Sequence, residues 1–471
     1  MNIWDKIKSL LDVNKRSLRV LAIVLFAALT TALLLIVRAA GPYVALEGEE
    51  ATNSGTLIKS DANASGGQYA EFTGGGISAT EYGAGVAGAS LAVPSGAVSV
   101  NPSNIVSEIN NKPAGTAFKL ADGTYKLGQL PNKTGNRYYG NPANHEAVVF
   151  DGETVYSGGK PTSGKMTVLT LLANNIVANL TIKRYRGDDT KGSGALTGGG
   201  DGVLIRNVEL YENQFVGLHF GGSNWDVSYI TSRHNGQYCY NGSGTGHHLS
   251  YFVALECGNE VLPIPRYTTT NDRGGSKFVQ TTDFTVEHGE VANMDDNGLW
   301  FDIANRDVII RNLWVHDVEQ HGIDIEASFG PGLIENNLVE DSAFENIDVA
   351  YRRACIFTAM TENVTIKNNT VRGCKNGIMG YQWNHPQWLG EINGTVQATP
   401  VRNLLVTGNT ISEITHHWAG VASLTSAAGC DANAACANNK FVGNTYTGNS
   451  PVFWWDDATR NLSYWTGEGF N

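Results

Sequence analysis

Carboxylates, a lysine and a tryptophan recur along this sequence at nearly constant intervals. Lys277, Trp300, Asp324 and Asp348 follow one another at spacings of 23, 24 and 24 residues, and Asp302 and Glu326 are 24 residues apart. Paired carboxylates can transfer protons or act as nucleophiles, and several together can hold a hard cation. We therefore asked which repeating element would bring these side chains together.

The same interval separates short apolar segments of the chain. Gly275, Gly298, Gly322 and Asn346 each precede a segment in which apolar and polar residues alternate, such as GLWFD, GIDIE and NIDVA. Alternation with a period of two predicts strands, and a fixed period of 20 to 30 residues indicates a solenoid. Leucine-rich repeats have a similar period, but their leucine framework is absent. The pattern therefore predicts a β-solenoid.

The repeat also resembles a known family. Residues 308–325 read V-x-I-x-N-x-x-V-x-x-x-x-x-x-G-I-x-I, which is similar to the right-handed parallel β-helix repeats of the pectate-lyase-like superfamily. The resemblance covers about residues 101–471 and implies an all-β, right-handed parallel β-helix. The superfamily includes lyases, hydrolases, epimerases, tail spikes and adhesins, so the resemblance does not fix the activity. It also implies an asparagine ladder at a turn, for which we expect Asn312, Asn336 and Asn368.

Strand alternation turns this alignment into a surface map, because every second side chain points outward. Two outward columns result. The first holds His219, Lys277, Trp300, Asp324, Asp348 and Met379, and the second holds Val279, Asp302, Glu326 and Ala350. Like charges on neighbouring strands destabilise a sheet. We therefore expect this face to bind a cation, share a proton or perform catalysis, unless it is simply an acidic face in contact with solvent.

The favoured hypothesis is a polysaccharide lyase. In such an enzyme Asp302, Asp324, Glu326 and Asp348 would hold Ca²⁺ as a cofactor, and the metal would neutralise a uronate carboxylate. Lys277 would then abstract the proton next to that carboxylate. This arrangement resembles pectate-lyase-like enzymes, in which acids hold calcium on an outer sheet and a basic residue acts as the base.

Two other functions use the same face. In a glycoside hydrolase, two of the residues Asp302, Asp324 and Glu326 would form an acid and base or nucleophile pair, about 5 Å apart for retention or about 6.5–9.5 Å for inversion. In a non-catalytic, adhesin-like surface protein the face would only bind polysaccharide. In each case Trp300, His219 and His321 are the candidate substrate-binding residues, with Trp300 able to stack on a sugar ring.

The N-terminus predicts attachment to a membrane. Residues 1–19 are basic and cytoplasmic in this prediction, and residues 20–38 form an apolar signal anchor. The body of the protein then lies outside the cytoplasm, or is secreted if the chain is cleaved near Ala39–Gly41. The first 41 residues carry a net charge of +4, so the rest of the chain carries −16. Such an acidic body disfavours nucleic acid and leaves polysaccharide and membrane as the expected partners.

Composition supports an all-β body with distinct ends. The 55 glycines and 44 asparagines suit turns rather than helices. Residues 39–100 predict a linker with short strands that resemble those of carbohydrate-binding modules. From residue 101 we expect a capping helix, then the β-helix to residue 471, closed by a C-terminal cap made of aromatic residues: Phe453, Trp454, Trp455, Tyr464, Trp465 and Phe470.

Six cysteines follow the predicted anchor, in the part of the chain expected to be exported, where disulfides persist. Six cysteines allow 15 connectivities. Close spacing in the chain favours pairing Cys239 with Cys257, Cys355 with Cys374, and Cys430 with Cys436.

Overall fold

The computed structural model describes much of the chain, in twelve segments. These are residues 56–60, 68–72, 81–157, 160–187, 194–259, 273–344, 353–382, 391–392, 395–396, 401–423, 438–455 and 458–470. The predicted anchor at residues 20–38 lies outside them. Among the described residues, no helix combines the length and apolar character needed to cross a membrane.

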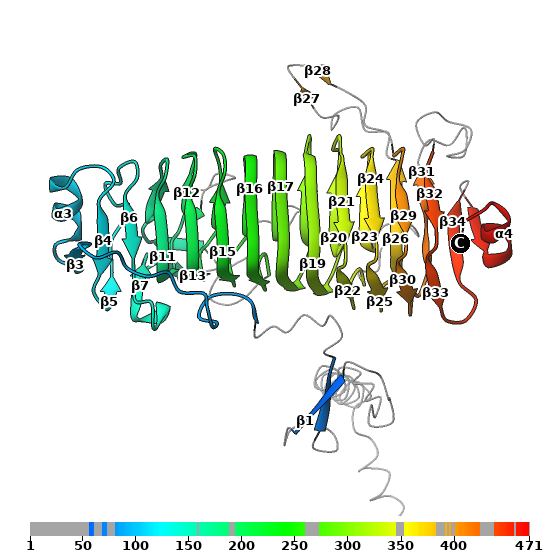
Figure 1. Cartoon of the computed structure of the whole chain (residues 1–471), viewed down its shortest axis with the longest axis horizontal. Helices are drawn as coiled ribbons and strands as arrows, with labels where there is room; N and C mark the ends of the chain where they lie inside the picture. Colours follow the sequence, from blue (N-terminus) through cyan, green and yellow to red (C-terminus); the bar gives the residue numbers. More distant parts are fainter. Residues whose placement is uncertain are drawn as a thin grey trace, which may run out of the picture. The chain divides into compact units, whose positions relative to one another are not determined.

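The chain divides into two compact units, Met1–Gly76 and Ile77–Asn471. In the first unit, β1 (Thr56–Ser60) pairs antiparallel with β2 (Gln68–Phe72). The second unit is a coil of parallel strands stacked in register along its axis (Figure 1). This confirms the all-β, β-helix fold that the repeat predicts.

The strands of the coil form three stacks, and the long strands continue around a bend from one stack to the next. The first stack, hereafter the first sheet, contains β10 (Leu169–Leu171), β12 (Gly194–Gly198), β14 (Val216–Phe220), the start of β16 (Tyr238–Leu255) and of β17 (Gly274–Met294), β18 (Asn297–Asp302), β20 (Ile323–Glu326), β23 (Ala354–Ala359), β26 (Asn376–Gln382), β31 (Ala419–Ser423) and β34 (Val452–Trp455).

The second stack runs beside it around the coil. It contains β3 (Val98–Val100), β4 (Ala117–Leu120), β6 (Arg137–Tyr139), β11 (Ile176–Lys183), β13 (Leu204–Tyr211), β15 (Asp226–Arg233), parts of β16 and β17, β19 (Arg306–Val318), β21 (Gly332–Glu335), β24 (Val364–Lys367), β29 (Leu405–Thr407) and β32 (Lys440–Val442).

The third stack is reached after a bend within the long strands. It contains β5 (Gly123–Tyr125), β7 (Val148–Asp151), the later parts of β11, β13, β15, β16, β17 and β19, and then β22 (Leu338–Glu340), β25 (Thr370–Arg372), β30 (Thr410–Ser412) and β33 (Thr445–Thr447). Outside the stacks, β8 (Val155–Ser157) pairs antiparallel with β9 (Lys160–Ser163), and β27 (Glu391–Ile392) with β28 (Thr395–Val396).

The core lies inside the coil because inward side chains alternate with outward ones. Leu299, Phe301, Ile323 and Ile325 are at most 1% exposed and belong to one continuous apolar cluster. Their neighbours in the chain, including Trp300, point to the outer face of the first sheet. The alternation therefore fixes which side chains are available for function.

A buried asparagine ladder stabilises one bend, but not at the residues that we expected. Asn312, Asn336 and Asn368 have left-handed backbone angles, with φ of 55°, 56° and 56°. The prediction was wrong by one residue, because the left-handed residue makes the bend and the next one turns inward. The ladder consists of Asn337, Asn369, Asn409 and Asn444, in which each amide nitrogen donates to the next side-chain oxygen at 2.9 Å.

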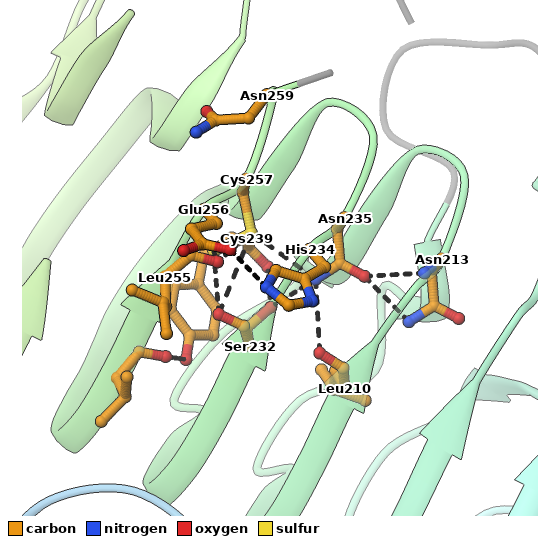
Figure 2. The surroundings of a disulfide bond; sticks show 12 residues. Leu210, Asn213, Ser232, His234, Asn235, Cys239, Leu255, Glu256, Cys257 and Asn259 are labelled. Atoms are coloured by element: carbon orange, nitrogen blue, oxygen red, sulfur yellow. Dashed lines mark hydrogen bonds and ion pairs between the residues drawn. A yellow bond between two sulfur atoms is a disulfide. The ribbon is translucent and has the colours of Figure 1, made fainter. Parts of the chain in front are cut away.

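Two disulfides lie within the coil. Cys239 is bonded to Cys257, and Cys355 to Cys374, as their spacing suggested. Figure 2 shows the first bond beside Ser232 and Asn235, two buried polar residues that hydrogen-bond to each other. Cys430 and Cys436 lie outside the described residues.

Helices and aromatic side chains cover the two ends of the coil (Figure 1). At the N-terminal end, α3 (Ile105–Asn111) buries Ile105 and Ile109 completely. At the C-terminal end, β35 (Ala458–Asn461) pairs antiparallel with β34 and leads into α4 (Leu462–Gly467). Trp465 of α4 is fully buried and stacks on Phe453, with ring centroids 4.4 Å apart. A short 3-10 helix, η4 (His145–Ala147), precedes β7.

Candidate functional site

The register of the first sheet brings most of the predicted residues together in two adjacent outward columns. In the first column Lys277 of β17 pairs with Trp300 of β18, which pairs with Asp324 of β20. In the second column Asp302 of β18 pairs with Glu326 of β20. Successive strands are about 4.8 Å apart. Three carboxylates, one ammonium group and one indole therefore share a small part of the outer face.

The next rung does not contain the residue that the period predicted. β20 pairs with β23, so Asp324 lies beside Phe357 and Glu326 beside Ala359. The predicted register, with Asp348 and Ala350 in these places, was wrong. The turn before β23 is longer than its predecessors, and turns can lengthen at small entropic cost while the strands stay in register. Asp348 itself lies outside the described residues.

Lys277 is closely associated with two neighbours. Its ammonium nitrogen lies 3.0 Å from Oδ2 of Asp302 and 3.7 Å from the centroid of the Trp300 ring. Both the ion pair and the cation–π contact favour the charged form of a lysine. The geometry therefore suits Lys277 as the counter-ion of Asp302 better than as a neutral base.

Asp324 occupies the least exposed position of the group. It is 1% exposed, and its pKa is raised well above 3.8, first by burial and then by the negative charges of Glu326 and Asp302. The positive charges of Arg353 and Lys277 oppose this rise. Oδ1 of Asp324 has no hydrogen-bond partner, and neither has Nε1 of its neighbour Trp300. Asp324 is therefore held as a neutral carboxylic acid.

The raised pKa predicts how stability depends on pH. A group whose pKa is higher in the folded state stabilises fully below its unfolded value, here 3.8, and loses this contribution as pH rises through the folded value. We expect Asp324→Asn, which cannot titrate, to be more stable than the wild type at neutral pH by at least about 1.4 kcal/mol, the equivalent of one pKa unit. Urea unfolding from about pH 4 to about pH 8 measures the difference.

The matched control for this experiment is Asp307→Asn. Asp307 is exposed and has a left-handed φ of 51°, a conformation that asparagine tolerates well. Its pH profile should run parallel to that of the wild type. Parallel profiles for Asp324→Asn as well would contradict the assignment of a neutral, buried Asp324.

The two predicted histidines lie on the same face in different settings. His219 belongs to the column of Lys277, with Asn241 between them. Burial lowers the pKa of His219, opposed by its hydrogen bond with Asn241, in which Nδ1 lies 2.8 Å from Oδ1. His321 lies one position before Gly322, and its ring stacks on Phe357 at 4.0 Å. Its Nδ1 accepts a hydrogen bond from the backbone of Ala354.

The residues that the sequence analysis missed are Asn241, Phe357 and Arg353. Asn241 lies in a glycine-rich segment whose strand signal is weak, and Phe357 was displaced by the misaligned turn. Arg353 is 7% exposed and precedes β23. The paired arginines just before the apolar segment ACIFTA were the available signal for that residue.

The carboxylates of this face do not converge as metal ligands do. Among the described residues, one group brings three ligand atoms within 4.8 Å of one another, namely His145, Glu146 and Glu209. Glu209 there also accepts a hydrogen bond from Arg233 at 2.8 Å. Ca²⁺ takes six to eight oxygens around one point. The described donors at Asp302, Asp324 and Glu326 therefore fit calcium poorly.

Comparison with known proteins supports the fold. The family described as right handed beta helix region matches residues 170–357. A mutant of the periplasmic alginate epimerase AlgG is similar over 74% of this chain and 84% of its own, with 11% identity and a TM-score of 0.50. The A-module of the Azotobacter vinelandii mannuronan C-5 epimerase AlgE6 is 14% identical over 79% of this chain and 97% of its own, with a TM-score of 0.39.

A third similar structure is the catalytic unit of the thermostable GH87 α-1,3-glucanase from Streptomyces thermodiastaticus strain HF3-3. It is 12% identical over 80% of this chain and 73% of its own, with a TM-score of 0.46. No curated protein matches the chain. At such low identities the comparisons establish a right-handed parallel β-helix and no particular chemistry.

Proposed function

We propose that this right-handed parallel β-helix protein is a retaining glycoside hydrolase that acts on a neutral polysaccharide. Asp302 is the nucleophile and Glu326 the general acid and base. The observation that carries the proposal is their direct pairing on adjacent strands, with Lys277 bound to Asp302 at 3.0 Å.

The spacing of the strands supports a retaining mechanism. Side chains directly opposite on neighbouring strands lie about 4.8 Å apart, close to the 5–5.5 Å between the carboxyl groups of retaining enzymes. In that mechanism the nucleophile must be ionised, and the ammonium group of Lys277 favours this form of Asp302. Two adjacent carboxyl groups seldom ionise together, so Glu326 is suited to carry the proton that the leaving oxygen needs.

The charge of the face supports a neutral substrate. The chain after residue 41 carries −16, and the site itself contains Asp302, Asp324 and Glu326. Lys277 is the cation closest to Asp302, and its charge is balanced there. A uronate polymer would therefore meet net repulsion, whereas the hydroxyl groups of a neutral sugar would not. An outward face extended over many rungs suits a polymer rather than a small molecule.

The calcium-dependent lyase stays a prediction and ranks second. It needs an anionic sugar, a metal bound by the carboxylates and a lysine that can lose its proton. The described contacts of Lys277 favour its charged form, and the three described carboxylates do not converge on one point. The hydrolase requires none of these three conditions.

Export and membrane attachment through residues 20–38 belong to the same proposal. The two disulfides support an oxidising compartment outside the cytoplasm. The basic segment before residue 20 supports a cytoplasmic N-terminus. A polysaccharide-active protein held in this way would meet its substrate at the cell surface.

Incubation of the protein with a panel of neutral and anionic polysaccharides tests the activity. We expect new reducing ends from a neutral glycan, with the anomeric configuration retained when products are followed by proton NMR. Inverted products would contradict the Asp302–Glu326 assignment. Unsaturated uronates formed only with Ca²⁺ would establish the lyase instead, and binding without turnover would establish the adhesin-like protein.

A further inference from the structure

The outer face of the first sheet differs in character on the two sides of the carboxylates. Towards the N-terminal end, the column of Lys277 continues through side chains that can hydrogen-bond, namely Asn241, His219, Thr197 and Thr170. Towards the C-terminal end, the same column continues from Asp324 through Phe357, Met379, Gly420 and Trp454. One side therefore suits a hydroxylated polymer, and the other does not.

Burial follows the same division. On the C-terminal side, the outward residues Ala354, Phe357, Ala359, Met379, Tyr381 and Ala422 pack into one apolar cluster and are at most 4% exposed. On the N-terminal side, Thr170, Thr197 and His219 are partly exposed. Thr170 also lines a pocket together with Gln129 and Leu172. A polymer therefore has accessible surface on one side of the carboxylates and almost none on the other.

Two unsatisfied polar atoms lie at the boundary between the sides. Nε1 of Trp300 and Oδ1 of Asp324 have no hydrogen-bond partner, although the two residues are only 8% and 1% exposed. They are neighbours in register. An unsatisfied buried polar group is costly, so such groups usually have a ligand or water partner. An indole nitrogen only donates and a carboxyl oxygen accepts, so one sugar hydroxyl can satisfy both.

We propose that the site takes the end of a glycan chain. The terminal sugar lies against Trp300 and Asp324, and the rest of the chain runs over Asn241, His219, Thr197 and Thr170. From Lys277 to Thr170 this track spans four rung intervals, or about 19 Å. The inference rests on the proposed hydrolase and makes that enzyme exo-acting, because the buried C-terminal side leaves no path for a chain that continues past the carboxylates.

Binding to the Asp302→Asn protein tests this inference without relying on turnover. The probes are neutral oligosaccharides of increasing length from the glycan that the wild type cleaves or, if none is cleaved, from the glycan bound most tightly. Each length is prepared uncapped, and with a bulky aromatic cap on the reducing or on the non-reducing end. We expect affinity to rise with length to a plateau, and one of the two caps to lower it by at least about tenfold.

Two variants of the Asp302→Asn protein locate the end and the track. Trp300→Phe keeps an aromatic ring but loses the N–H, and should weaken binding about three- to tenfold at every length. Asn241→Ala should abolish the gain from added length while leaving the shortest probe unaffected. Asp226→Asn, an exposed change on the second stack, is the matched control and should behave like the parent protein.

The failures of the two proposals differ. Equal affinity for probes capped at either end or at both ends would overturn the chain-end inference, even if the wild type hydrolyses the glycan. A rapid fall in viscosity at the first release of reducing ends would also overturn it, because it shows internal cleavage. Conversely, chain-end binding without turnover in the wild type would leave this inference standing and refute the hydrolase.

Discussion

Replacement of Asp302 by asparagine is expected to lower kcat for glycan hydrolysis by at least about 10³-fold, the scale seen when a nucleophile is removed. The amide is almost isosteric but cannot form the glycosyl intermediate. It can still contact Lys277, which lies 3.0 Å from Oδ2 in the wild type. Release of reducing ends measures the loss, and thermal unfolding checks that the fold is kept.

A second variant separates the role of nucleophile from that of a binding residue. In Asp302→Gly, added azide can take the place of the missing carboxylate and attack the sugar directly. A single displacement then gives a glycosyl azide of inverted configuration. Asp307→Asn, which lies on β19 in the second stack, serves as the control and should keep full activity. Retention of activity in Asp302→Asn, to within about tenfold, would eliminate Asp302 as the nucleophile.

Replacement of Glu326 by alanine is expected to lower kcat by about 10²–10⁴-fold on natural glycans, the usual contribution of a general acid and base. Glu326 is partly exposed, unlike the buried Asp324 on the same strand, so it can reach a bound glycosidic oxygen. A substrate with an acidic phenol as its leaving group does not need protonation. For such an aryl glycoside, the first chemical step should therefore be nearly normal in the variant.

The two proposed roles predict opposite stereochemistry with azide. In Glu326→Ala, azide attacks the glycosyl–Asp302 intermediate, so two displacements give a glycosyl azide of retained configuration. Equal losses on natural and aryl substrates would show that Glu326 does not act as the acid. An inverted azide product from this variant would assign the nucleophile to Glu326 and require the two roles to be exchanged.

Most of the site was predictable because it lies where the repeat is regular. From Gly275 to Glu326 each turn of the coil has the same length, so aligning the glycines gave the correct pairing of Lys277, Trp300 and Asp324. The prediction failed at the first irregular turn, where Asn346 resembled the glycine column that Cys355 occupies in the structure. Both NIDVA and ACIFTA read as strands, and local sequence does not show which of them pairs with β20.

The sequence by itself determined the coil and the outward side of each strand, because both follow from local periodicity and side-chain alternation. Only the tertiary structure decided what each outward residue contacts. The burial that keeps Asp324 neutral, the ammonium group of Lys277 beside Asp302 and the apolar surface that begins at Phe357 depend on neighbouring rungs. Rungs are joined by turns of variable length, and register is set by packing between strands that are distant in sequence.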